Sequence, residues 1–132
     1  MTVRMLVIDD EPDGEILFRQ EFRREVRQGH YKLDFALSGK AALETLDGSG
    51  GEGTILLICE IGARGISGLD LLKAVKARWR DLPVFMISKH DDCDTVARAM
   101  ALGAGGYLGK PVDFAKLKQD MAAVMTDGRG NG

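Results

Sequence analysis

Polar residues that could handle a phosphoryl group stand at the ends of four apolar segments of the chain. In chain order they are Asp9 and Asp10, Glu60, Ser88 and Lys110. Two carboxylates about 4 Å apart repel each other by about 4 kcal/mol at an effective dielectric of about 20, so three carboxylates in one place need a cation. Carboxylate oxygens suit Mg²⁺, which also accepts phosphate oxygens. If the four segments are neighbouring strands, the pattern predicts a metal-assisted phosphoryl site.

Each of these residues has an ordinary interpretation when it is taken alone. Acidic residues after a strand are usually solvated loop residues, and a Lys-Pro pair is usually a turn. The functional interpretation depends on all of them following successive strands in order.

The apolar segments have the length and composition of buried strands. Continuous apolar runs predict strands at Met5–Ile8, Ile55–Cys59, Val84–Ile87 and Gly106–Leu108. The segment Tyr31–Ala36 alternates apolar and polar residues and is typical of an edge strand.

Helical patterns separate the strands. Phe18, Phe22 and Val26 recur at four-residue spacing and predict one helix from Pro12 to a stop at Gly29. Further helices are expected from a cap at Ser38 through residue 46, from residue 67 to about residue 79, from about residue 96 to a stop at residue 103, and from residue 114 to about residue 124. Alternation of strand and helix predicts an α/β fold, with a parallel sheet covered by helices on both faces. In an open doubly wound sheet, ligands bind beyond the carboxyl ends of the strands, where the polar residues lie.

Composition indicates one globular domain. The chain has 132 residues, 45% of them hydrophobic, and a formal net charge of −2 from 18 basic and 20 acidic residues. This balance gives no electrostatic reason to expect nucleic-acid or membrane binding, and no apolar run is long enough for a membrane helix. Cys59 and Cys93 form no metal or disulfide pattern and are expected to be reduced thiols in a cytoplasmic protein. We expect a domain at residues 1–126 and a flexible tail at 127–132.

The motifs VIDDEPD, EIGARGISGLDLL, PVFMIS and GAGGYLGKP together resemble the receiver domain of two-component response regulators, over a range from about Val3 to Met125. The resemblance implies a flavodoxin-like receiver fold, a five-stranded parallel sheet of order 2-1-3-4-5 with helices on both faces. It implies a role in phosphorelay signalling and no enzymatic activity beyond the domain's own phosphorylation.

The resemblance also assigns roles to the residues of the site. It implies that Asp10 binds Mg²⁺ directly, that Asp9 acts largely through water, and that the carbonyl of Gly62 completes the protein ligands, beside the carboxylate at position 60. Ser88 would be the switch hydroxyl and Tyr107 the aromatic residue whose rotamer follows it. Lys110 would pair with the phosphoryl oxygens.

Glu60 departs from the family at the phospho-acceptor position, where an aspartate is usual. Its extra methylene carries the carboxylate about 1.5 Å further, which is about one bond length. In-line attack needs tighter placement than that, so we expect impaired phosphorylation. The longer carboxylate could reach Lys110 or Ser88 and partly imitate the phosphorylated state, or the domain could act as a phosphorylation-independent interaction module. The alternatives are a silent pocket and a working Mg²⁺-dependent phospho-acceptor.

Three further departures surround the site. Arg64 stands where the family usually has proline, so the loop after Glu60 is expected to be less rigid. Lys89 replaces a small residue and could reach the acidic cluster, and His90 could screen the pocket from water. The ordinary interpretation, which the sequence favours for Lys89 and His90, is that their side chains point into solvent.

Two other protein classes share part of the pattern. A haloacid-dehalogenase-type phosphohydrolase needs an aspartate two residues after its nucleophile, where this chain has Glu11, and a further acidic pair after the lysine. A flavodoxin-like cofactor binder needs a phosphate-cradling loop after the first strand, and the acidic DDEPDG would repel phosphate.

By resemblance, partners bind the face formed by the fourth and fifth expected helices and the strand between them, at about residues 92–102, 105–108 and 113–125. The exposed charges there would include Arg98, Lys116 and Lys118. The expected partners are a histidine kinase, a phosphotransfer protein, an effector or a second copy of the chain, with no nucleic acid and no membrane.

Overall fold

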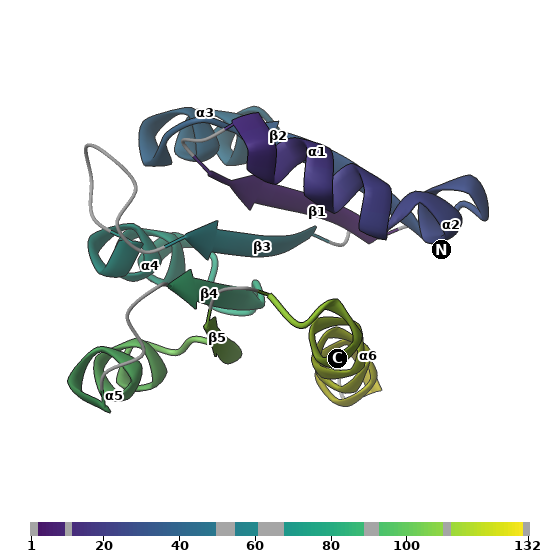
Figure 1. Ribbon diagram of the computed structural model, residues 1–132. Helices are drawn as coiled ribbons and strands as arrows, with labels where there is room; N and C mark the ends of the chain where they lie inside the picture. Colours follow the sequence, from purple (N-terminus) through teal and green to yellow (C-terminus); the bar gives the residue numbers. More distant parts are fainter. Residues whose placement is uncertain are drawn as a thin grey trace.

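The computed structural model describes residues 3–9, 12–49, 55–60, 68–88, 93–109 and 112–130. Within these ranges five parallel strands form one sheet in the order β2-β1-β3-β4-β5. The predicted fold class and strand order are confirmed (Figure 1). The strands are β1 (Val3–Ile8), β2 (Tyr31–Ala36), β3 (Ile55–Glu60), β4 (Val84–Ser88) and β5 (Gly106–Gly109).

The helices correspond to the predicted ones, except that the first is divided into two and the last is longer than expected. They are α1 (Pro12–Glu21), α2 (Arg23–Arg27), α3 (Gly39–Ser49), α4 (Gly68–Arg78), α5 (Cys93–Ala101) and α6 (Phe114–Gly130). The single helix expected from Pro12 to Gly29 is wrong in detail, because Phe22 (φ −104°, ψ 13°) separates α1 from α2. Phe18 and Phe22 are buried as expected, but Val26 is 41% exposed.

Several predicted helix ends are confirmed by their hydrogen bonds and backbone angles. The backbone N–H of Ala41 donates to Ser38 Oγ at 3.1 Å, so Ser38 caps α3. Gly29 and Gly103 have φ of 78° and 98°, the left-handed conformation that glycine adopts without strain at a helix end. At the other end of the chain, α6 extends through Gly130, into the segment expected to be a flexible tail.

The sheet is buried on both faces, as its continuous apolar strands predict. One face, covered by α3, α4 and α5, buries only small and aliphatic residues among those described, and we call it the aliphatic face. The other face, covered by α1 and α6, includes all five phenylalanines of the chain, and we call it the aromatic face. In Figure 1, α4 and α5 lie on one side of the sheet and α6 on the other.

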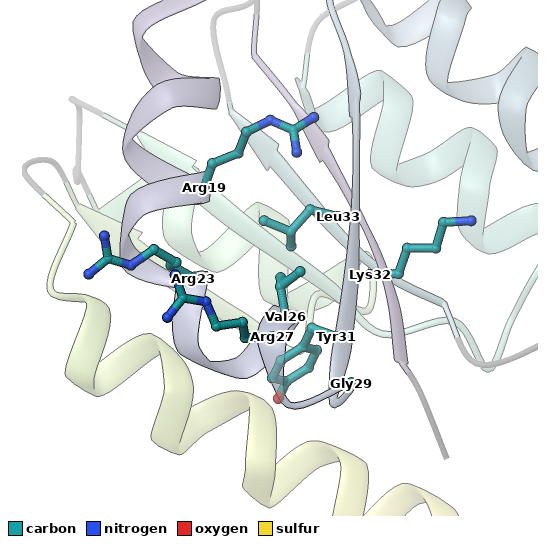
Figure 2. Close-up of a pocket in the computed structure, with 8 residues that line it drawn as sticks. All are labelled: Arg19, Arg23, Val26, Arg27, Gly29, Tyr31, Lys32 and Leu33. Atoms are coloured by element: carbon teal, nitrogen blue, oxygen red, sulfur yellow. The ribbon is translucent and has the colours of Figure 1, made fainter.

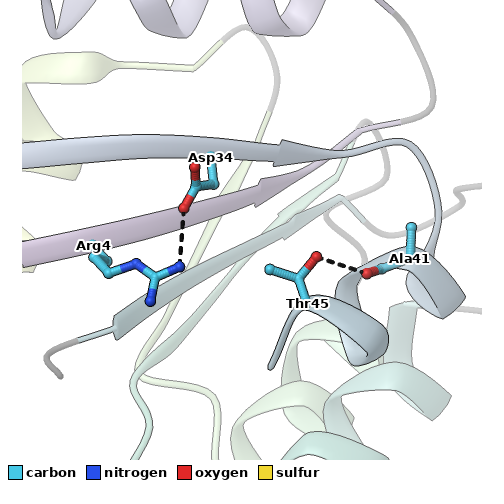
Figure 3. A network of polar contacts seen from close by, with 4 residues as sticks. All are labelled: Arg4, Asp34, Ala41 and Thr45. Carbon is cyan, nitrogen blue, oxygen red and sulfur yellow. Dashed lines mark hydrogen bonds and ion pairs between the residues drawn. The ribbon is translucent and has the colours of Figure 1, made fainter. Parts of the chain in front are cut away.

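Polar contacts add to the order of the edge strand. The Arg4 side chain on β1 donates from Nη2 to Asp34 Oδ2 on β2 at 3.3 Å (Figure 3). On α3, which follows β2, the Thr45 hydroxyl donates to the carbonyl of Ala41 at 3.0 Å.

In the described part of the chain, every helix is too short or too polar to cross a membrane.

Candidate functional site at the carboxyl ends of the strands

The register of the sheet brings three of the predicted site positions to one edge. Ile8 pairs with Cys59, so Asp9, the next residue, is level with Glu60 at the end of β3. Glu60 pairs with Ile87 on β4, and Ser88 pairs with Gly109 on β5. The convergence expected from the sequence is therefore confirmed for the backbone of these positions.

The carboxylate of Asp9 lies against the first turn of α1. A Cβ placed on Gly14 would stand 2.0 Å from Asp9 Oδ2 and 2.8 Å from its Cγ, so only a glycine leaves room for this carboxylate. The backbone N–H of Asp9 donates to the carbonyl of Ala36 at 3.1 Å. A carboxylate near the amino end of a helix is stabilised by the partial positive charge there. Gly14 therefore fixes where Asp9 can lie.

Sequence reasoning did not single out Gly14. A signal was present, because a glycine within a helical segment suggests close approach of another group. Which group approaches it depends on how β1 turns into α1, and the local pattern does not specify that.

Most of the other predicted site residues lie outside the described residues. They are Asp10, Gly62, Arg64, Lys89, His90 and Lys110, together with the side chains of Glu60 and Ser88. In the ranges that are described, no three histidine, cysteine, aspartate or glutamate residues come together as a metal site. The role of Asp9 at the metal, the direct metal ligands and the contacts of Lys110 thus stay predictions.

Tyr107, the predicted switch aromatic, lies on β5 opposite Met86. It is half-buried and packs against the core of the aliphatic face. It stands two residues before Gly109, the register partner of Ser88. Its movement with Ser88 stays a prediction.

The predicted partner face is formed by α5, β5 and α6. Arg98 and Lys116 are exposed, and Lys116 Nζ lies 3.8 Å from Asp120 Oδ2 one helical turn away. Met100 is also exposed, at 48%. The expectation that Lys118 presents its charge to a partner on this face is wrong, because its ammonium group contacts the Glu25 carboxylate on α2 at 2.8 Å.

A family comparison agrees with this geometry. The model of the response regulator receiver domain matches residues 5–122 of the chain. The chain belongs to the response regulator receiver domain family. This receiver domain is 31% identical over 122 residues to the response regulator protein PilR of Pseudomonas aeruginosa. That match covers 92% of the chain but only 26% of PilR, so the chain spans a small part of this relative.

Solved receiver structures have the same fold. A CheY-like response regulator receiver domain protein from Methanospirillum hungatei superposes with a TM-score of 0.87 over 100% of both chains, at 18% identity. The response regulator TrrA from Thermotoga maritima, solved in complex with Mg²⁺ and BeF, superposes with a TM-score of 0.76 at 26% identity, over 93% of this receiver and 99% of TrrA. The receiver domain is thus a module of two-component signalling by family and by fold.

Proposed function

We propose that this receiver domain works as a protein-interaction module whose phosphorylation is impaired and whose site partly imitates the phosphorylated state. The observation that carries the proposal is the glutamate at the end of β3, level with Asp9 and paired in register with Ile87. By resemblance, this is the phospho-acceptor position. The other polar residues of the site keep the family's identities and order.

The length of the glutamate side chain is the physical reason. Its carboxylate extends about one bond length, about 1.5 Å, beyond that of an aspartate, which displaces the nucleophilic oxygen from in-line geometry. The same extension moves it toward the place of a phosphoryl group, where Lys110 and Ser88 would bind it. A carboxylate carries one negative charge, whereas a phosphoryl group carries about 1.5 to 2, so the imitation is partial.

Mg²⁺ fits the residues of this site. The carboxylate of Asp9 lies above Gly14, which has no side chain to displace it, and would act largely through water, whereas Asp10 and the carbonyl of Gly62 would supply direct oxygen ligands. Hard oxygen donors of this kind are the ligands of Mg²⁺. When bound, the cation would neutralise the clustered carboxylates and the oxygens of a phosphoryl group.

Partners would bind the face of α5, β5 and α6, because it presents exposed charged and apolar side chains. Arg98, Met100 and Lys116 supply these groups. We propose a histidine kinase, a phosphotransfer protein or an effector in the cytoplasm as the partner. A second copy of the chain is the alternative on the same face.

A second candidate function is a working Mg²⁺-dependent phospho-acceptor. It is supported by Asp9, which directly follows β1 and is level with Glu60 in the register of the sheet. An acyl phosphate can form on a glutamate as well as on an aspartate, with transfer of the phosphoryl group from the donor to a carboxylate oxygen.

Intact mass distinguishes the two candidates. The wild type and Glu60→Asp are incubated with Mg²⁺ and acetyl phosphate, with Asp10→Ala in the Glu60→Asp background as the metal control. The proposal expects a phosphoryl adduct only on Glu60→Asp. Equal labelling of the wild type would establish the second candidate instead. If neither protein were labelled, Glu60 alone would not explain the impaired phosphorylation, and Lys89 or Arg64 would be the next residues to change.

Imitation is tested separately by partner affinity. The partner would first be captured with the BeF complex of Glu60→Asp, and its affinity for the wild type would then be measured. Partial imitation expects wild-type affinity between those of Glu60→Asp with and without BeF. If the partner bound the wild type only as tightly as Glu60→Asp without BeF, Glu60 would not imitate the phosphorylated state.

A further inference from the structure

A basic groove lies where the junction of α1 and α2 packs on β2. It has a volume of about 570 Å³. Its lining residues, drawn in Figure 2, are Arg19, Arg23, Val26, Arg27, Gly29, Tyr31, Lys32 and Leu33. Most of the side chains around it are exposed, so it is an open surface groove and not a closed cavity.

The arginines come from one helical face. Backbone hydrogen bonds of helical type continue across Phe22, from its N–H to the carbonyl of Phe18 at 3.0 Å and from Val26 N–H to the carbonyl of Phe22 at 2.9 Å. Arg19, Arg23 and Arg27 are therefore four residues apart along a nearly continuous helix, and such residues are neighbours on its surface.

Part of the positive charge in the groove has no ion-pair partner among the described residues. Arg19 is paired with Glu15 at 2.9 Å and lies over the ring of Phe35. Arg23, Arg27 and Lys32 have no ion pair with another described residue.

Glu25, the acidic residue of α2, is paired with a residue outside the groove. Glu25 Oε2 accepts a hydrogen bond from Lys118 on α6 at 2.8 Å. This pair draws the Glu25 carboxylate toward α6, and Glu25 does not line the groove. The two free guanidinium groups of Arg23 and Arg27 lie on the same side of the groove in Figure 2.

The groove also has an apolar floor. Val26 is 41% exposed, an unusual fraction for a valine that the sequence pattern places on a core face. Leu33 and the half-buried ring of Tyr31 lie beside it. A ligand for this groove therefore needs both an apolar group and negative charge.

The groove is remote from the phosphoryl site. It adjoins the first half of β2, where Tyr31 pairs with Val3 at the beginning of β1. The phosphoryl site lies after Ile8, which pairs with Ala36 at the other end of the same two strands. The proposal for the groove therefore does not rest on the function proposed for Glu60.

We propose that this groove binds a short acidic segment of a partner protein that carries an apolar anchor side chain. Carboxylates pair with Arg23 and Arg27, since guanidinium groups bind carboxylates in a bidentate fork, and the anchor packs on Val26, Leu33 and Tyr31. The open shape suits a peptide that lies along the surface. Nucleic acid is disfavoured because the chain as a whole carries a net charge of −2 and the first turn of α1 contains Asp13 and Glu15.

The test measures fluorescence anisotropy of a fluorescein-labelled peptide of glutamates around one central tryptophan. Wild type is expected to bind it, and Arg23→Glu with Arg27→Glu to weaken binding by about tenfold or more. Lys73→Glu with Arg80→Glu makes the same change in net charge at exposed residues outside the groove and should weaken binding less than about twofold. Val26→Ser should weaken binding of this peptide but not of its all-glutamate analogue.

Several results would overturn the proposal. They are no binding of the peptide to wild type, equal loss in the Lys73 and Arg80 control, and equal binding of a peptide in which glutamine replaces glutamate. Tighter binding of a single-stranded DNA oligonucleotide with the same dependence on Arg23 and Arg27 would assign the groove to nucleic acid instead. Circular dichroism checks folding, and Arg23→Gln with Arg27→Gln serves if the charge reversal unfolds the domain.

Discussion

The two faces of the sheet are packed with different kinds of side chain. On the aromatic face, the ring of Phe22 meets Tyr31 at 5.7 Å and Phe114 at 6.2 Å, both nearly perpendicular, and Phe18 meets Phe114 at 5.1 Å. On the aliphatic face, the buried residues, such as Leu72 and Val75, carry no rings, and the rings of Trp79 and Tyr107 that pack against them are only partly buried. Edge-to-face ring pairs have a preferred geometry, whereas aliphatic side chains pack with little directional preference.

The two faces also differ in how lysines connect their elements. On the aromatic face, Lys118 Nζ contacts Glu25 Oε2 and the carbonyl of Glu21, each at 2.8 Å, and lies 5.0 Å from the centre of the Phe22 ring. On the aliphatic side, Lys76 Nζ donates to the carbonyls of Arg80 and Leu82, which are near it in the chain. The aromatic face therefore joins α6, part of the predicted partner face, to α2, which lines the basic groove.

The largest expected effect comes from removing Phe22. The residue is fully buried and is surrounded by Phe18, Tyr31, Phe114 and the Lys118 ammonium. Phe22→Ala should lower the free energy of unfolding by about 3–5 kcal/mol, measured by urea denaturation. The loss combines an apolar cavity with the ring and cation contacts.

Leu72→Ala is the matched truncation on the aliphatic face, and Leu17→Ala is the surface control. Leu72 is also fully buried, and its loss is expected at about 2–4 kcal/mol, without a change in the Lys118 contacts. Leu17 is 44% exposed on α1, so its truncation should cost less than about 1 kcal/mol. If Phe22→Ala lowered the free energy of unfolding less than Leu72→Ala does, the directional ring contacts of the aromatic face would add nothing to stability.

The next effect concerns the Lys118–Glu25 pair. Burial raises the pKa of the Glu25 carboxyl, but the hydrogen bond and charge of Lys118, with smaller contributions from the backbone and Arg24, lower this pKa more. Because the folded pKa is below the unfolded one, the pair stabilises the fold at neutral pH, and this stability is lost as pH falls through the lowered pKa. Glu25→Gln should lower the free energy of unfolding by about 1–2 kcal/mol at neutral pH. It should also make this free energy depend less on pH in the acid range.

Urea unfolding of wild type and Glu25→Gln across the acid range measures this difference. Glu15→Gln is the control, because Glu15 belongs to an exposed ion pair with Arg19 that is expected to contribute little. If Glu25→Gln and wild type lost stability in parallel on acidification, the pair would have no part in joining α6 to α2.

Gly14→Ala is expected to have the smallest effect on stability. Its main effect is expected on Mg²⁺ binding at the site. Alanine favours a helix over glycine by up to about 1 kcal/mol, and the atom in its way is the end of the Asp9 side chain, which can rotate. Stability should change by less than about 1 kcal/mol, whereas Mg²⁺ affinity should fall about tenfold because Asp9 is displaced. Isothermal titration of Mg²⁺ measures the affinity.

Asp9→Asn is the reference variant for this prediction, because it removes the charge without filling the space. Both variants should weaken Mg²⁺ binding. If Gly14→Ala bound Mg²⁺ as wild type does, the position of Asp9 over the first turn of α1 would have no role in metal binding.

The interface and stability roles of three residues could not be predicted from the sequence, and the reasons are physical. Val26 continues the four-residue apolar spacing of Phe18 and Phe22, yet it is exposed and lines the open groove beside β2. Lys118 looks like a surface charge, but its partner Glu21 is 97 positions away in the chain. The constraint on Gly14 comes from a neighbouring turn.

The alternation of strands and helices, the parallel sheet, and the sheet edge shared by positions 9, 60 and 88 could be predicted from the amino-acid sequence. Hydrophobic period and chain order are local properties, and the carboxyl ends of parallel strands share one edge. Three features became apparent only in the folded molecule: Asp9 lies over Gly14, Lys118 joins α6 to α2, and a basic groove opens beside β2. These features depend on contacts between segments far apart in the chain, and no local pattern specifies which side chains will meet there.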